Sequence, residues 1–165
     1  MSPTITVRQP TLDDLPAIRD LQFRAFGPGR FARTAYRIRE GKPLISRFCL
    51  VASSGAELIA AIRFTEVTIG GVSGALLLGP LAVEPAYAGL GHGKRLVAEG
   101  LANGKTAGIK LSVLVGNESY YARFGFVRVQ PGQICFPGPV DPHRILAAAL
   151  APDALAGFRG LITAA

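Results

Sequence analysis

The stretch that decides the fold runs from residue 78 to residue 96 and reads LGPLAVEPAYAGLGHGKRL. Its apolar first part predicts a strand, and its basic last part predicts the start of a helix. Between the two, Gly89, Gly91 and Gly93 alternate with other residues. Backbone N–H groups at a helix start lack partners within the helix and carry partial positive charge, and glycine lets an anion approach them closely. The stretch therefore predicts a cradle for a phosphate-like anion.

Two common phosphate-binding motifs do not fit this loop. A P-loop requires glycine five residues before its Gly-Lys pair and Ser or Thr after it, and here Ala88 and Arg95 occupy those positions. A dinucleotide-binding fingerprint requires two residues between its last glycines and opens the first helix of a βαβ unit. Here a single residue separates Gly91 from Gly93, and the loop lies in mid-chain. The sequence therefore argues against P-loop and Rossmann sites.

The N-terminal part of the chain predicts a strand followed by helices. Residues 5–8 alternate apolar and polar side chains, as in a half-buried strand. Thr11 and Asp14 have capping-box spacing before a run of apolar residues at helical spacing that ends near Phe26. Beyond a Gly-Pro-Gly break, residues 31–40 predict a second, arginine-rich helix.

The pattern changes to strands from residue 48. Three apolar or β-branched runs at residues 48–52, 58–69 and 75–83 are separated by short turns and predict an antiparallel meander. After the glycine loop, we expect a helix that ends near Asn103-Gly104. The remaining expected elements are a strand at 110–115, a short helix at 118–124, strands at 126–129 and 144–150, and a tail at 152–165 with a turn or short helix and an edge strand. These interleaved elements predict an α+β (mixed α/β) fold with a mixed sheet.

Composition indicates a single globular domain. The 165 residues are 49% hydrophobic and 18% charged, and no repeat or linker divides them, so we treat residues 1–165 as one domain. No apolar run approaches the roughly 18 residues needed to cross a bilayer, and no signal-peptide core is visible, so we expect a soluble, cytoplasmic protein. Cys49 and Cys135 lie far apart in sequence without a nearby histidine, which predicts reduced, buried thiols and no metal site.

The charge of the chain suggests an anionic partner. The net charge is +7, and residues 1–47 hold nine basic and four acidic side chains. Nucleic acid is disfavoured, because aromatic residues make up only 8% and no RNA- or DNA-binding signature is present. A phosphorylated small molecule or a solvated basic face explains the charge equally well.

Two motifs resemble the GNAT family of N-acetyltransferases. The loop Ala88-Gly89-Leu90-Gly91-His92-Gly93 resembles the family's pyrophosphate loop, and residues 81–87 before it have the usual L-x-V-x-P-x-Y form. The segment VLVGNESYYARFGF at residues 113–126 resembles the family's strand, short helix and Y-x-x-x-G-F ending, in the Y-Y-x-R-F-G-F form of a bacterial subgroup. The resemblance covers residues 4–130. It implies a mixed, mostly antiparallel sheet of about seven strands flanked by about four helices.

The resemblance also implies acetyl-CoA as cosubstrate, without a metal. The backbone of the strand before the loop binds the pantetheine arm in this family, and the loop amides hold the pyrophosphate. Ala88 departs from the family pattern, which usually has Gln or Arg there, so one side-chain contact is lost. The implied cofactor-binding residues are Leu81, Ala82, Val83, Ala88, Gly89, Leu90, Gly91, His92, Gly93, Lys94, Asn117 and Tyr121.

The implied reaction is direct transfer of an acetyl group to an amine. Tyr121 stands at the position of the family's usual general acid, and Tyr120 ranks below it because adjacent helical residues face different ways. The general base stays open between Glu66, Glu84 and water. His143 is a further candidate on the acceptor side, although no partner for it is evident.

The sequence leaves three functions in competition. The first is an acetyl-CoA-dependent N-acetyltransferase acting on a primary amine of a small molecule or protein. The alternative is a catalytically silent acyl-CoA-binding sensor or interaction domain, which the departure at Ala88 and the lack of an assigned general base would suit. The third and weakest is nucleic-acid binding through the arginines of residues 19–47. Residues 145–150 could complete the sheet of their own chain or face a second copy, so a homodimer stays open.

Overall fold

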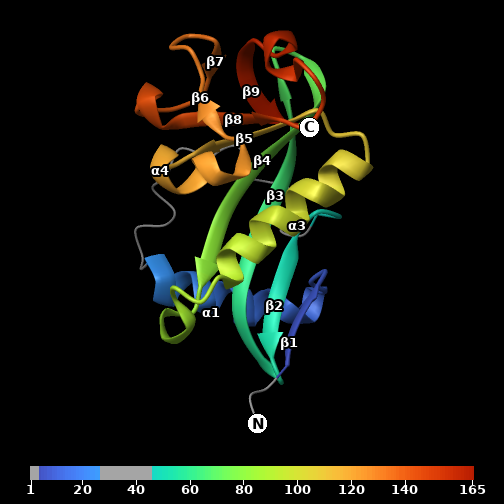
Figure 1. The fold of residues 1–165 in the computed structure, drawn as a ribbon, viewed down its shortest axis with the longest axis vertical. Helices are drawn as coiled ribbons and strands as arrows, with labels where there is room; N and C mark the ends of the chain where they lie inside the picture. The colour runs from blue at the N-terminus through green and yellow to red at the C-terminus, as the bar shows by residue number, and fades with distance from the viewer. Residues whose placement is uncertain (1–3, 27–45) are drawn as a thin grey trace.

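The structure, a computed structural model, describes residues 4–26 and 46–165 (Figure 1). The helix predicted at residues 31–40 lies outside the described residues. The strands are β1 (Ile5–Arg8), β2 (Leu50–Ser54), β3 (Glu57–Ile69), β4 (Val72–Val83), β5 (Leu111–Val115), β6 (Val127–Arg128), β7 (Ile134–Cys135), β8 (Ile145–Ala149) and β9 (Gly160–Ala164). The described helices are α1 (Leu15–Phe26), α3 (His92–Thr106) and α4 (Glu118–Tyr121), with 3-10 turns η1 (Leu12–Asp14), η3 (Pro85–Tyr87), η4 (Ala122–Phe124), η5 (Pro142–Arg144) and η6 (Ala154–Gly157).

The predicted meander is confirmed. Strands β1 to β4 pair in sequence order, each antiparallel to the next, and β4 then pairs in parallel with β5. Strand β8 adds to β5 and β6 adds to β8, both antiparallel, so residues 145–149 complete the sheet of their own chain. Strand β9 pairs with the end of β3, at Val67–Ile69.

The described sheet has nine strands, two more than the resemblance implied. One addition is β7, a two-residue strand at a place where the sequence predicted no element. Its partner is β9, which is parallel to it. A strand of two residues is too short to show an alternation of apolar and polar residues in the sequence. Its position is fixed by its pairing with β9.

The turn η1, which leads into α1, is capped as predicted. The amide of Thr11 donates to the Asp14 carboxylate at 2.7 Å, and both halves of the capping box are present. Arg8, on β1, donates to the same carboxylate at 2.7 and 2.9 Å. This hydrogen bond from Arg8, with that from Thr11, holds the pKa of Asp14 well below its usual range. The three residues join β1 to the beginning of α1.

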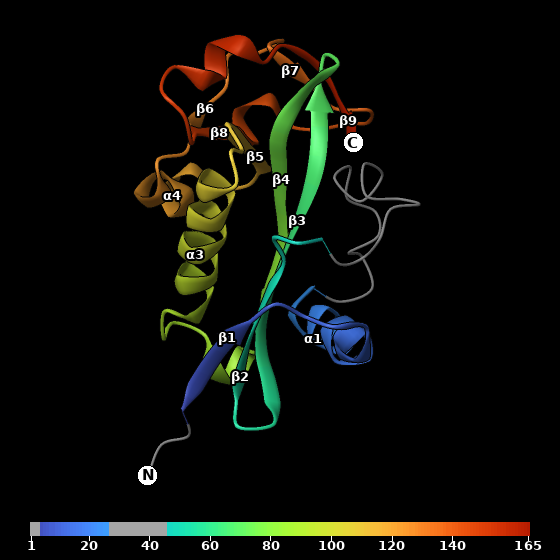
Figure 2. The same ribbon diagram turned by 90° about the vertical axis from the view of Figure 1, so that its right-hand side faces the viewer.

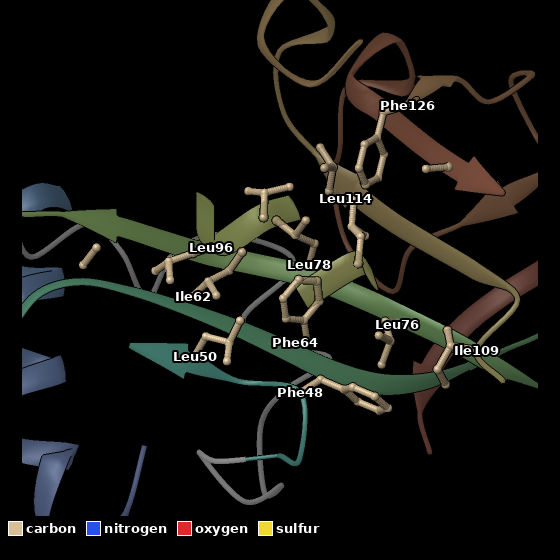
Figure 3. Close-up of a cluster of buried hydrophobic side chains, with 14 of the residues drawn as sticks. Phe48, Leu50, Ile62, Phe64, Leu76, Leu78, Leu96, Ile109, Leu114 and Phe126 are labelled. Carbon is tan, nitrogen blue, oxygen red and sulfur yellow. The ribbon is translucent and has the colours of Figure 1, made fainter. Parts of the chain in front are cut away.

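Helices cover both faces of the sheet. Figure 2 shows α3 and α4 on one face and α1 on the other. Under α3 lies the larger part of the core, which includes Phe64, Leu76, Leu96 and Leu114 (Figure 3). Gly100 brings α3 close to β3, because a Cβ there would collide with the ring of Phe64. The core therefore fixes the distance between α3 and the sheet.

Three details differ from, or add to, the sequence predictions. Helix α3 continues to Thr106, past its expected end at Asn103-Gly104, because Gly104 packs inside the helix against Leu76 instead of ending it. Cys49 is buried as expected, whereas Cys135 is exposed. Among the helices of the described residues, none combines the length and apolar character needed to cross a membrane.

Candidate functional site

Within the part of the chain that the structure describes, the second half of β4 has a free edge. Its parallel pairing with β5 covers only Ala75–Leu77, opposite Leu111–Val113. Strand β4 then continues to Val83, and its partner along this part is β3. The ladder shifts register where β4 passes Gly79-Pro80, between its partners Ile62 and Phe64. A gap between two parallel strands thus opens halfway along β4.

Backbone groups at this edge are directed away from β3. In an antiparallel ladder, pairs that exchange hydrogen bonds alternate with pairs that do not. The amide of Glu84 donates to the carbonyl of Ile59 at 2.8 Å, so Ala82, two residues earlier in the same register, also bonds to β3. By the same alternation, Leu81 and Val83 direct their N–H and C=O groups to the side that β5 has left. A ligand lying along this edge meets both donors and acceptors.

The glycine loop follows directly from this edge. After β4 the chain makes the turn η3, passes Gly89 and Gly91, and enters the fifteen-residue helix α3 (Figure 1). Gly89 and Gly91 have φ values of 79° and 90°, a region that favours glycine. A Cβ at either position would meet no atom within 4 Å. The space in front of the helix N-terminus is therefore open, and the free amides of the first turn face it.

Positive charge is available beside the loop. Lys94 is exposed and has no ion pair in the described part of the chain. Arg95 is paired with Glu99 one turn later, at 3.0 Å. The ring of His92 meets Tyr87 edge-on with centroids 6.0 Å apart, which is consistent with a surface position for His92. Among the described residues beside the loop, Lys94 is thus a cation that is free to meet an anion.

Two adjacent tyrosines on α4 point in different directions. The ring of Tyr121 packs edge-on against Phe126, with centroids 5.8 Å apart, and covers Gly116 so closely that a Cβ there would lie 2.9 Å from it. Burial, aided by Tyr120, raises the pKa of Tyr121 to about 12. The hydroxyl of Tyr120 instead lies 3.5 Å from the place that a Cβ of Gly93 would take. Tyr120 therefore faces the first turn of α3.

Both acidic candidates for a general base are engaged in ion pairs. Glu84, at the end of β4, is held by Arg24 of α1 at 2.7 Å, and its side chain is only 16% exposed. Glu66 lies opposite Leu76 in the closed half of the sheet and is paired with Arg47 at 3.1 Å. The Arg24–Glu84 pair fastens the beginning of the loop to α1. Each of the two carboxylates thus already has an arginine partner.

A polar pocket of about 640 Å³ lies on the side of α4 that faces β6 and η5. It contains His143, as well as Asn117 at the start of α4. Asn117 is the only predicted cofactor residue among its lining residues, so the pocket is separate from the loop. The lining residues are Gly116, Asn117, Glu118, Ser119, Ala122, Arg128, Asp141, His143 and Arg144.

The structure therefore brings most of the predicted residues together and adds others. Residues 81–83 and 88–94 lie next to one another, because one strand, one loop and the start of one helix follow directly on each other there. The sequence analysis ranked Tyr120 below Tyr121 as the general acid. Adjacent residues on a helix differ by about 100° in direction, so one of the two tyrosines could have been expected to face α3. Sequence reasoning also missed the Arg24–Glu84 pair, because sixty residues separate the partners.

Comparison with known protein families and curated proteins identifies relatives of this chain. Residues 46–128, about half of the chain, match the model of the acetyltransferase (GNAT) domain. The chain is 32% identical over 116 residues to YjhQ of Escherichia coli strain K12, an uncharacterised N-acetyltransferase; the match includes 68% of this chain and spans 64% of the length of YjhQ. It is 29% identical over 150 residues to the uncharacterised N-acetyltransferase YhbS of the same strain, with 90% and 89% covered.

Solved structures agree with the sequence comparison. The crystal structure of Escherichia coli YhbS in complex with CoA superimposes with a TM-score of 0.82 at 28% identity, covering 100% of this chain and 92% of that one. A GNAT acetyltransferase from Brucella melitensis, in complex with acetyl-CoA, gives a TM-score of 0.66 at 31% identity, with 92% and 97% covered. The sequence resemblance is thereby confirmed, and the chain belongs to the GNAT acetyltransferase family.

Proposed function

We propose that the protein is an N-acetyltransferase that transfers the acetyl group of acetyl-CoA to a primary amine of a small molecule or a protein. The observation that carries this proposal is the open cradle at Gly89 and Gly91, which follows directly on the free edge of β4. An extended ligand with a diphosphate at one end and amides along its length fits that sequence of features. The complexes of YhbS with CoA and of the Brucella melitensis protein with acetyl-CoA support this choice of ligand.

The cofactor contacts follow from the direction of the backbone. The amides from Gly89 to Lys94 would hold the diphosphate, with Lys94 adding charge. The outward-facing backbone groups of Leu81 and Val83 would bond the pantetheine arm, whereas Ala82, whose polar groups face β3, would contribute only its position in the strand. The Ala88 side chain offers no polar contact to CoA. The loop backbone would therefore contribute a larger share of the binding energy here than in relatives that have Gln or Arg at this position.

The reaction needs one nucleophile and two proton movements. The neutral amine attacks the thioester carbonyl, the C–N bond forms, and the C–S bond breaks as negative charge moves from the carbonyl oxygen to the leaving sulfur. The thiolate takes a proton from a nearby acid, and the nitrogen, positively charged after the attack, loses a proton to solvent as the amide forms. Because Glu66 and Glu84 are both paired with arginines, we assign the removal of the proton from the nitrogen to water.

Tyr121 is the proposed acid. Its raised pKa, about 12, keeps the hydroxyl protonated at neutral pH, so that it is available as a donor. Once the proton has moved to the thiolate, Tyr121 recovers one from solvent. We expect Tyr121→Phe to lower the turnover number by roughly 100-fold, in the range usual for general acid catalysis, while CoA binding persists.

A two-stage experiment tests the function. Calorimetric titration of the purified protein with acetyl-CoA and with CoA measures binding first, and we expect saturable micromolar affinity for both. A panel of small primary amines and lysine-containing peptides is then assayed for release of the CoA thiol. Release with at least one amine supports transfer. Tight binding without release from any amine favours the sensor alternative, and absence of binding contradicts both functions.

A further inference from the structure

Tyr120, on α4, has no part in the proposed chemistry, but its hydroxyl lies beside Gly93 at the start of α3. The nearest atoms to an ideal Cβ at Gly93 are Val83 Cγ2 at 3.2 Å, Leu81 Cδ2 at 3.5 Å and the Tyr120 hydroxyl oxygen at 3.5 Å. Gly93 lies in the first turn of α3, and Leu81 and Val83 lie on the free edge of β4. The hydroxyl therefore reaches the junction of three elements: α4, α3 and the open half of β4.

The hydroxyl shares this junction with the apolar side chains of Leu81 and Val83. It makes no hydrogen bond with any residue that the structure describes. Tyr120 is half-buried, and the removal of water raises the pKa of its hydroxyl. A hydroxyl that has no protein partner can give its hydrogen bond to a ligand in place of water, and such a bond strengthens binding. The Tyr120 hydroxyl is thus a donor at the junction that no described residue uses.

Neighbouring aromatic and charged groups fix the direction of the ring. Tyr121 meets Tyr120 edge-on with centroids 4.8 Å apart, and Phe124 is tilted against it at 6.0 Å. The guanidinium carbon of Arg123 lies 5.0 Å from the ring centroid, in cation–π range. Arg123 also opposes the rise in the pKa of Tyr120 that burial causes. The hydroxyl stays protonated at neutral pH and is held toward α3, ready to donate.

We infer that Tyr120 is a binding residue for the pantetheine arm of CoA and donates a hydrogen bond to one of its amide carbonyls. The inference rests on the proposed function, because it takes the arm to lie along Leu81 and Val83 before it reaches the glycine loop. An arm in that position passes the junction where the Tyr120 hydroxyl lies. Of the groups in CoA, the pantetheine amides are the ones that can accept this bond there.

The test is a pair of tyrosine-to-phenylalanine variants with two probes. Tyr120→Phe removes the hydroxyl and keeps the ring. Tyr87→Phe is the control, because its hydroxyl bonds Glu57 at 3.4 Å, away from the junction. The probes are CoA and adenosine 3′,5′-bisphosphate, which keeps the nucleotide but lacks the pantetheine arm. Calorimetry gives the Kd of each pair, and thermal unfolding checks that both variants are folded.

We expect Tyr120→Phe to raise the Kd for CoA by about 3- to 10-fold, the effect of one hydrogen bond. Its Kd for adenosine 3′,5′-bisphosphate should equal that of the wild type, and Tyr87→Phe should change neither value. Equal CoA affinity of wild type and Tyr120→Phe overturns the inference and leaves the proposed function standing. Equal losses for the two probes overturn it as well, because they indicate a structural effect. If the wild type does not bind CoA, both proposals fail together.

Discussion

The two halves of β4 show how one strand serves both stability and binding. In the closed half, Ala75–Leu77 is paired on both edges and buried, and Leu76 and Leu77 have no exposed surface. In the open half, Leu81–Val83 is paired with β3 alone and leads into a loop where Leu90 is 66% exposed. The closed half holds the sheet together, and the open half leaves backbone groups available to a ligand.

The difference arises from the neighbours of β4 and not from its own sequence. Residues 75–83 are a nearly continuous apolar run, typical of a buried strand along its whole length. Strand β5 pairs with β4 over three residues and then ends at Val115, where it passes into α4. A binding edge can therefore be made from ordinary strand sequence when a neighbouring strand leaves.

The same substitution in the two regions should have very different effects on stability. Leu76→Ala removes a fully buried side chain from the closed half, and we expect a loss of about 2–5 kcal/mol in the free energy of unfolding. Leu90→Ala acts on an exposed side chain of the loop and should change it by no more than about 0.5 kcal/mol. Denaturant titration measures both. Similar losses for the two variants would contradict the contrast between the buried closed half of β4 and the exposed loop that follows its open half.

A second pair of variants separates backbone strain from ligand binding. Gly91 and Gly132 have similar φ values, 90° and 86°, and a Cβ at either would meet nothing within 4 Å. We expect Gly91→Ala and Gly132→Ala each to cost about 1–3 kcal/mol in stability, because alanine is strained in this region. Since only Gly91 borders the proposed cradle, Gly91→Ala alone should weaken CoA binding, by at least about tenfold, as its Cβ holds the diphosphate away.

Calorimetry with CoA on both glycine variants decides this prediction. Equal affinity of the two variants, at wild-type strength, would show that the diphosphate does not lie against Gly91. A loss of affinity in Gly132→Ala as large as that in Gly91→Ala would show that strain, and not position, governs binding.

The smallest effect concerns Tyr121, which packs where β5 ends. Its pKa is about 12 in the folded protein, against about 10 for an ordinary tyrosine, so the folded state holds the proton more firmly than the unfolded state. The associated stability is present below pH 10 and is lost as the pH rises toward 12. We therefore expect the thermal unfolding midpoint of the wild type to decrease as the pH is raised from about 9.5 to about 11.5. The fall should be smaller in Tyr121→Phe. The same slope in both proteins would contradict burial of this hydroxyl.

The sequence was sufficient for the elements that depend on local patterns. The capping box at Thr11 and Asp14, the meander, and the strand–loop–helix order around Gly89 and Gly91 all follow from spacing over a few residues. The function of the loop needed more than spacing. An anion cradle follows from the glycines, but acetyl-CoA as the anion came only from the resemblance to the family.

Features that depend on long-range contacts could not be predicted. Strand β7 is too short to leave a pattern and exists because β9 pairs with it. The Arg24–Glu84 pair joins residues that only the folded sheet brings together. The direction of Tyr120 depends on where α4 lies relative to α3, which the sequence of α4 does not contain.

The most direct test of the central claim, that CoA lies along the open half of β4 and in the glycine loop, is a crystal structure of the protein with CoA. We predict the diphosphate within hydrogen-bonding distance of the amides of residues 89–94. The pantetheine arm should bond the outward-facing backbone groups of Leu81 and Val83. CoA bound in the pocket beside His143, or a pantetheine arm that does not contact β4, would contradict the account.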